Sequence, residues 1–285
     1  MKLAIISGKG GTGKTSIAVG LFLAMAKSNI PVSLVDLDVE EPNTHLFFKK
    51  ENQNPKKIPL PFFIPQSDQT LCTHCGACAL VCQYHALAVF SNSWMVFPEL
   101  CHACKRCYDH CPTGALKEKP IVIGQVQKQV LNNGILAEGR METGNIQTTY
   151  VIKETKKQVL EPLYQIWDGP PGTSCPALES VKGANRIWIV TEPSPLGMHD
   201  LKLILSALKE EPVVKEVVLN KSEKLIPPKI IEICQEFQVP VIAQIPFSKK
   251  GAKAYAHGKS LWDIKKNRPI FLNLVKHLKG VFHES

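Results

Sequence analysis

The stretch Gly8-Lys9-Gly10-Gly11-Thr12-Gly13-Lys14-Thr15 decides the fold of this 285-residue chain. It joins a short apolar run, Leu3 to Ser7, to a helical stretch from Lys14 to about Ser28, which predicts strand, loop and helix. Its glycines let backbone N–H groups turn toward phosphate oxygens at the positive end of the helix dipole. Lys14 supplies charge for the β- and γ-phosphates, and the Thr15 hydroxyl is suited to ligate Mg²⁺. The pattern G-x-x-x-x-G-K-[ST] therefore predicts a site for ATP formed by Gly8, Lys9, Gly10, Gly11, Thr12, Gly13, Lys14, Thr15 and Ser16.

The same stretch also fits a dinucleotide-binding fingerprint. Gly8, Gly10 and Gly13 form G-x-G-x-x-G, and an acidic residue follows at Asp36. That fingerprint gives no reason for a cation and a hydroxyl in the first helical turn. Lys14 and Thr15 therefore favour a nucleoside triphosphate.

The remaining chain alternates between expected strands and helices. The expected strands are 32–36, 121–123, 149–152, 165–168, 186–191, 216–220 and 240–245, and helices begin near Pro176, Pro195 and Pro227. This alternation predicts an α/β fold, a mostly parallel sheet with helices on both faces. Four lysines and four prolines between Lys49 and Pro65 indicate a linker. We predict a P-loop domain in two parts, 1–62 and 119–285, split by an insert at 63–118.

Eight of the ten cysteines lie between positions 72 and 111. The spacing C-x₂-C-x₂-C-x₃-C occurs twice, and in the ferredoxin run with this spacing the fourth cysteine ligates the other cluster. The expected ligand sets for two 4Fe–4S clusters are Cys72, Cys75 and Cys78 with Cys111, and Cys101, Cys104 and Cys107 with Cys82. Proline follows Cys111, whereas Gln83 follows Cys82. The spacing predicts a small α+β ferredoxin-like insert.

Other roles for the cysteines are weaker. Zinc also binds paired C-x₂-C units, but it leaves the third cysteine of each triplet without a role. Disulfides need an export route, and the N-terminus is too short for a signal peptide. No apolar run approaches the 18 residues of a spanning helix, so we expect a cytoplasmic protein without a membrane span. Cys234 fits a buried core position, and a redox or metal role for Cys175 stays open.

Two aspartates end expected strands at the edge where ligands bind in parallel sheets. Asp38 closes the second strand, and Asp168 opens the segment Gly169 to Gly172. Either acid alone is more often a strand-end or capping residue. Together with the loop, they can organise Mg²⁺ and orient the attacking water.

At this point the chain resembles the MinD/ParA family of P-loop ATPases, which includes the nitrogenase iron protein and the Mrp-type iron–sulfur carriers. The resemblance rests on Lys9 of the deviant Walker A loop, LVDLD ending at Asp38, DGPPGT from Asp168, and VLNK with Asn220. Over its length the chain is similar to members with an inserted ferredoxin domain.

The resemblance implies an ATP-dependent dimer, with a second copy or a paralogue, in which Lys9 reaches the partner's phosphates. It also implies catalytic roles for Lys9 and Lys14, water orientation by Asp38, Mg²⁺ organisation by Asp168 and base contact by Asn220.

The position of the insert, between the Asp38 and Asp168 loops, suggests how the two parts work together. We hypothesise that nucleotide state gates electron transfer through the clusters to a redox partner protein. The alternatives are a cluster assembly or carrier ATPase, and a positioning ATPase with a redox-sensing insert. The formal charge is +9, but the lysines are scattered, so we expect no nucleic acid partner. Residues 269–282 are amphipathic and fit a docked closing helix better than a membrane anchor.

Overall fold

The computed structural model describes residues 1–48, 54–131, 134–159, 164–222 and 225–283. The strands are β1 (Lys2–Ser7), β2 (Val32–Asp36), β3 (Lys56–Ser67), β4 (Leu87–Phe90), β5 (Ser93–Val96), β6 (Leu116–Leu131), β7 (Gly134–Met141), β8 (Tyr164–Pro171), β9 (Arg186–Thr191), β10 (Val214–Leu219) and β11 (Val241–Gln244). The helices are α1 (Lys14–Lys27), α2 (Ala77–Leu80), α3 (Arg106–Asp109), α4 (Thr148–Lys157), α5 (Cys175–Val181), α6 (Pro195–Ala207), α7 (Pro228–Glu236), α8 (Lys249–Ala256) and α9 (Arg268–His283).

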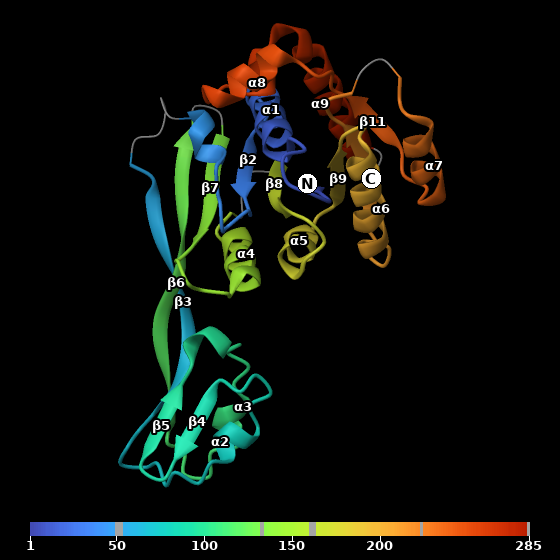
Figure 1. The fold of residues 1–285 in the computed structure, drawn as a ribbon. Coiled ribbons are helices and arrows are strands. Elements are labelled where there is room, and N and C mark those ends of the chain that lie inside the picture. The colour runs from blue at the N-terminus through green and yellow to red at the C-terminus, as the bar shows by residue number, and fades with distance from the viewer. Residues whose placement is uncertain (49–53, 132–133, 160–163, 223–224, 284–285) are drawn as a thin grey trace.

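The main sheet has the order β11-β10-β9-β1-β8-β2-β7-β6-β3. From β11 to β7 every neighbouring pair is parallel, and β6 runs antiparallel to both β7 and β3. The predicted α/β fold with a mostly parallel sheet is therefore confirmed (Figure 1).

Two helical layers cover the sheet, as the alternation of strand side chains requires. In β1, Leu3 and Ile5 pack with residues of α1 and α9, while Ala4 and Ile6 pack with residues of α4, α5, α6 and α7. The C-terminal helix α9 thus docks on the core, with Phe271 and Leu274 buried. In the part of the chain that the structure describes, no helix combines the length and apolarity that crossing a membrane requires.

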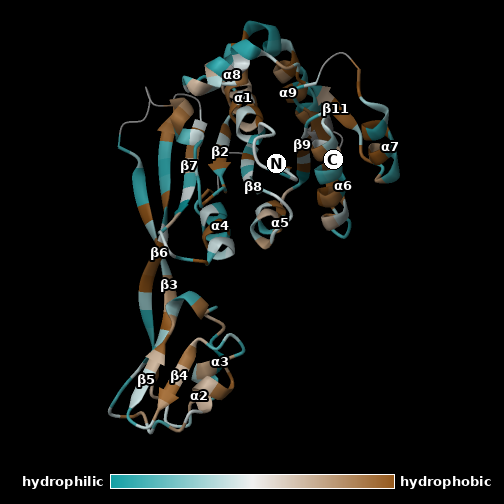
Figure 2. Cartoon of the chain, in the orientation of Figure 1, coloured by the Kyte–Doolittle hydropathy of each residue, from teal (hydrophilic) through white to brown (hydrophobic). Residues whose placement is uncertain are grey.

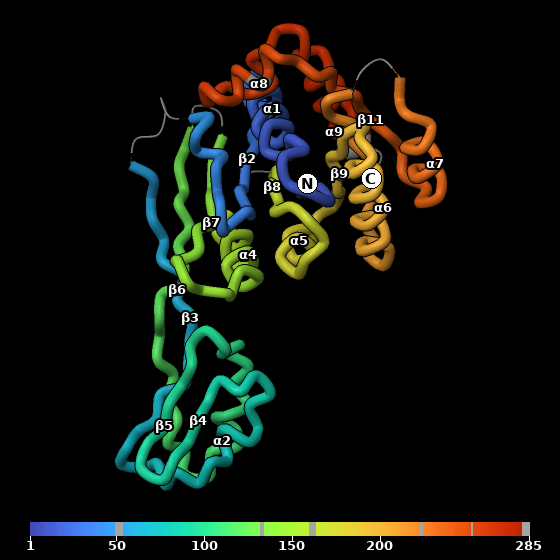
Figure 3. Tube along the Cα trace, in the orientation of Figure 1, coloured from blue at the N-terminus to red at the C-terminus, as the bar shows by residue number. Residues whose placement is uncertain are grey.

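A long two-stranded ribbon carries the insert away from the sheet. β3 and β6 pair from Lys56 with Lys128 to Ser67 with Leu116, but β6 pairs with β7 only over Gly124–Leu131. Residues 61–67 and 116–122 therefore extend beyond the sheet (Figure 1). The predicted boundaries at 62/63 and 118/119 fall inside this ribbon. The trace in Figure 3 shows the insert standing apart from the α/β part.

The insert is built from two short helices, α2 and α3, and one antiparallel pair, β4 and β5. Its own core is small, with Cys78, Leu87 and Leu116 buried together. Hydrophobic residues colour β4 brown in Figure 2. A core of this size gives little stability by itself, so the insert needs additional cross-links, such as metal sites.

Two sequence predictions are wrong. Residues 56–65 of the supposed linker form β3, while 49–53 lie outside the described residues. β3 tolerates Pro59, Pro61 and Pro65 because it is the edge strand of the sheet. Residues 149–152, expected as a strand, lie in α4, where Val151 and Thr155 are buried one helical turn apart.

Candidate functional site

The phosphate loop connects the end of β1 to the start of α1, as predicted. Gly11 and Gly13 have positive φ angles of 75° and 98°, the left-handed region that favours glycine. A side chain at Gly13 would also collide with Asn220, whose Nδ2 donates a hydrogen bond to the Thr12 carbonyl at 2.7 Å. The strand-end Asn220 therefore fixes the loop from the side.

A cavity of about 440 Å³ opens over this loop. The predicted residues that line it are Gly10, Gly11, Gly13, Lys14, Thr15, Ser16, Asp38 and Asn220. Pro246, Phe247 and Tyr255, from α8 and the segment before it, also line the cavity and were not predicted. The volume and the mixture of apolar walls with a cationic floor suit a nucleotide.

Asp168 lies behind the loop with its carboxylate fully buried and without a hydrogen-bond partner among the described residues. Burial raises the pKa of Asp168 to about 6, and the charge of Lys14 and the Thr15 hydroxyl oppose the rise. A buried carboxylate without donors is costly, and Mg²⁺ with its bound waters supplies the missing partners. The residues therefore fit Mg²⁺ beside Thr15.

The loop that carries Asp38 is fixed by hydrogen bonds to the side chain of Asp36. The carboxylate of Asp36 accepts hydrogen bonds from the backbone N–H groups of Asp38, Asn43 and Thr44 at 3.0 to 3.1 Å. Burial and the charges of Asp168 and Glu138 raise the pKa of Asp36, and these N–H donors oppose the rise. Burial is also the main cause that raises the pKa of Asp38, against the charge of Lys14.

Lys9 forms an ion pair within its own chain. Its Nζ lies 2.6 Å from Glu192 Oε1, and Lys221 Nζ lies 2.9 Å from Glu192 Oε2. Lys221 also donates to the Gly11 carbonyl at 2.8 Å. Partial burial alone would raise the pKa of Glu192, but the hydrogen bonds and charges of Lys9 and Lys221, with the Ser194 hydroxyl, together outweigh it and lower the pKa to about 2. Lys9 and Thr12 do not line the cavity, and Gly8 packs closely on Asp200.

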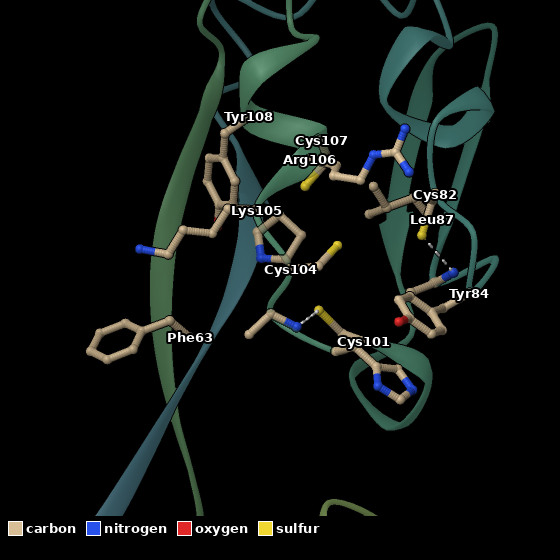
Figure 4. A pocket seen from close by; sticks show the side chains of 14 residues that line it. Phe63, Cys82, Tyr84, Leu87, Cys101, Cys104, Lys105, Arg106, Cys107 and Tyr108 are labelled. Atoms are coloured by element: carbon tan, nitrogen blue, oxygen red, sulfur yellow. Dashed lines mark hydrogen bonds between the residues drawn. The ribbon is translucent and has the colours of Figure 1, made fainter. Parts of the chain in front are cut away.

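The eight clustered cysteines gather into two pockets. The proximal pocket contains Cys82, Cys101, Cys104 and Cys107 (Figure 4), and the distal pocket contains Cys72, Cys75, Cys78 and Cys111. These are the two sets expected from the spacing, each closed by one cysteine of the other repeat. All eight are free thiols.

The proximal pocket also contains backbone N–H donors and a pair of stacked rings. The backbone N–H groups of Ala86 and Ala103 donate to the sulfurs of Cys82 and Cys101 at 3.3 and 3.5 Å (Figure 4). Such bonds stabilise thiolates and tune cluster potentials. Tyr84 and His102 stack at the rim with ring centroids 3.8 Å apart.

No three His, Cys, Asp or Glu side chains of the described residues converge as a single metal ion would require. A 4Fe–4S cluster poses a different requirement, because each thiolate binds a different iron and the four sulfurs surround the cluster. Two pockets with four cysteines each meet that requirement by donor number and type.

The two other cysteines lie outside these pockets. Cys234 is buried in the main core, as expected. Cys175 is exposed at the start of the short helix α5.

This sheet, loop and cavity define a P-loop nucleotide-binding protein. Residues 3–261 match the CobQ/CobB/MinD/ParA nucleotide binding domain family, and the chain belongs to it. The MinD and ParA members of this family are ATPases.

Several relatives extend this comparison. Two uncharacterised proteins of Methanocaldococcus jannaschii are 26% identical over 91% of both chains and 30% identical over 78% of both. The iron–sulfur cluster carrier protein of Pyrococcus furiosus is 45% identical over 47 residues, 16% of each chain. The septum site-determining protein MinD of Pyrococcus horikoshii, complexed with Mg-ADP, has a similar fold with a TM-score of 0.58, at 19% identity over 97% of this chain and 95% of that one.

Proposed function

We propose that this chain is an ATP-hydrolysing iron–sulfur protein in which nucleotide state governs electron transfer through two 4Fe–4S clusters to a partner protein. One observation carries the proposal: two four-cysteine pockets lie on an insert that emerges beside the nucleotide cavity. β6 joins the sheet at Gly124, which pairs with Met141 at the carboxyl end of β7. β2 runs parallel to β7 and ends at the same edge, next to Asp38.

Each nucleotide-site residue has a defined part in this proposal. The loop N–H groups and Lys14 hold the phosphates, Thr15 and Asp168 hold Mg²⁺, and Asp38 orients the attacking water. Bound Mg²⁺ supplies neutralisation of the phosphate charge. Lys9 contributes from the partner subunit of an ATP-dependent dimer, after its pair with Glu192 has opened.

The pockets supply the electron-transfer part. Each pocket has one buried cysteine, Cys78 or Cys101, and one exposed cysteine, Cys75 or Cys104, so a cluster there would be shielded on one side and accessible to a partner on the other. Burial and neighbouring thiols raise the pKa of Cys107 to about 11, which favours the thiol form of this side chain. The iron of a bound cluster would supply the compensating positive charge and would keep the cysteines in the thiolate form.

Purification under anaerobic conditions, or reconstitution with iron and sulfide, tests the cofactor content. We expect roughly eight irons per chain, two 4Fe–4S signals after reduction, and ATP hydrolysis that depends on Mg²⁺. Zinc bound in two tetrahedral thiolate sites without iron uptake, or iron without ATP hydrolysis, would contradict the proposal.

Cluster delivery is a second candidate, and the local matches to iron–sulfur cluster carrier proteins favour it. In that function the insert would give its clusters to an acceptor instead of passing electrons. Incubation with an apo-ferredoxin separates the two functions. A cluster that appears on the acceptor supports delivery, whereas a retained cluster that reduces an added electron acceptor supports electron transfer.

A further inference from the structure

The first turn of α4 contacts both functional parts of the molecule. Thr148 Oγ1 donates a hydrogen bond to Glu40 Oε1 at 3.0 Å, and Glu40 lies two residues after Asp38. The adjacent Gln147 Nε2 donates to the backbone carbonyl of Cys101 at 2.6 Å, in a buried position. Two consecutive residues thus join the nucleotide loop to a cysteine of the proximal pocket.

The same turn also packs on the point where the ribbon leaves the sheet. The Tyr150 hydroxyl donates to the Pro61 carbonyl at 2.7 Å, and its ring meets Phe62 edge-on with centroids 5.0 Å apart. The register of β3 and β6 shifts here, because Leu60 pairs with Gly124 and Pro61 with Val122. The extra residue, Ile123, is a β-bulge, a feature that bends a strand locally.

The two cysteine pockets differ in their attachment. Cys101 belongs to the main hydrophobic core, and Cys82 packs against it. Cys78 belongs to the separate small core of the insert, against which Cys111 packs, as do Cys82 and Cys107 of the proximal pocket. Cys101 alone among the eight cysteines is buried within the main core. A displacement of the Asp38–Glu40 loop therefore has a packed, hydrogen-bonded route to the proximal pocket.

We infer that Gln147 and Thr148 are positioning residues through which the nucleotide loop sets the backbone of Cys101, so that nucleotide state acts on the proximal pocket and not on the distal one. The inference rests on the proposed function, because a nucleotide effect on the pocket matters only if the pocket holds a cluster. Its test measures the backbone at Cys101 and does not require bound clusters. The Gln147 bond is buried and the Thr148 bond is partly buried, so a displacement of the loop must replace or break one of these hydrogen bonds.

Hydrogen exchange of the whole protein tests this inference directly. In the wild type, the Mg-ATP analogue should change the exchange of residues 98–105, whereas residues 72–78 should not respond. Gln147→Leu should speed exchange at 98–105 roughly two- to tenfold and abolish the response, because one buried hydrogen bond is lost. Thr148→Val should also abolish the response, and Thr148→Ser, which keeps the hydroxyl, should retain it.

Gln165→Leu is the control, since Gln165 Nε2 also donates to a buried backbone carbonyl, that of Val159, at 2.8 Å, while its Oε1 accepts from Trp167 Nε1 at 3.0 Å. This control should keep the nucleotide response at 98–105. A wild-type response in both Gln147→Leu and Thr148→Val, or an equal response at 72–78, would overturn the inference. Missing iron or missing ATP hydrolysis would overturn the proposed function instead, so the two failures are distinguishable.

Discussion

At the residue scale, the nucleotide site contains charged side chains whose surroundings in the nucleotide-free protein differ from those needed for catalysis. Asp168 is buried without a donor, and Lys9 is paired with an acid of its own chain. In the proposed function, both arrangements change when Mg²⁺ and nucleotide bind. Each residue therefore has a measurable signature in the nucleotide-free protein.

Replacing Asp168 by Asn should lower ATP hydrolysis by roughly 100-fold or more, because a ligand for Mg²⁺ is lost. It should also change how stability depends on pH. Burial raises the pKa of Asp168 from 3.8 to about 6, so between these values the native state binds more protons than the unfolded state. Stability therefore falls as pH rises through this window, by up to about 3 kcal/mol.

Denaturant unfolding of nucleotide-free protein at pH 5 and pH 7.5 measures this effect. Wild type should lose stability relative to Asp168→Asn over this interval, and Mg-ADP should reduce the difference. Parallel pH profiles for the two proteins would show that Asp168 does not carry a buried proton.

Replacing Glu192 by Gln should release Lys9 and Lys221 and favour self-association with ATP. Because the pair is partly exposed, we expect association at a roughly two- to fivefold lower protein concentration. Sedimentation with a Mg-ATP analogue measures it. The control Glu232→Gln breaks an exposed pair with Lys229, 2.8 Å long, and should leave association unchanged. Weaker association of Glu192→Gln would contradict a restraining role for Glu192.

At the element scale, the crossing of cysteines between repeats makes a specific prediction. Cys82 lies in the first repeat but lines the pocket of the second. If each pocket holds one cluster, Cys82→Ala with Cys104→Ala should retain roughly four irons, since both changes affect one cluster. Cys82→Ala with Cys75→Ala should lose both clusters. Iron and sulfide analysis of the anaerobic proteins decides, and the reverse pattern would mean that each repeat binds its own cluster.

The elements also show what the sequence could and could not predict. The phosphate loop and the cysteine sets could be predicted, because their spacing is local and their chemistry requires it. The sequence does not predict β3, because prolines are excluded from central strands but tolerated at an edge. Residues 149–152 fit a strand by their β-branched side chains, but packing on the sheet selects a helix.

Long-range partners were beyond sequence reasoning. Glu192 forms an ion pair with Lys9 across most of the chain. Glu138 accepts hydrogen bonds from Thr44 and His45 across about a third of it. No spacing rule connects such residues. Gln147 likewise contacts Cys101 only because the fold places this part of the insert beside the start of α4.

At the scale of the whole molecule, the topology places the nucleotide loops and the exit of the cysteine-rich insert at the same edge of the sheet. The insert leaves beside the carboxyl ends of β2 and β7, where the nucleotide loops lie (Figure 1). A ribbon with one bulge and the first turn of α4 connect the two parts. This arrangement suits a protein that converts nucleotide state into a change at the insert.

The most direct test of this account is redox potentiometry of the iron-loaded protein in nucleotide-free, Mg-ADP and Mg-ATP-analogue forms. We predict that the midpoint potential of one cluster and its electron-transfer rate to an added acceptor change between the ADP and ATP forms, while the other cluster keeps its potential. Identical potentials and identical rates in all three forms would contradict the claim that nucleotide state governs electron transfer.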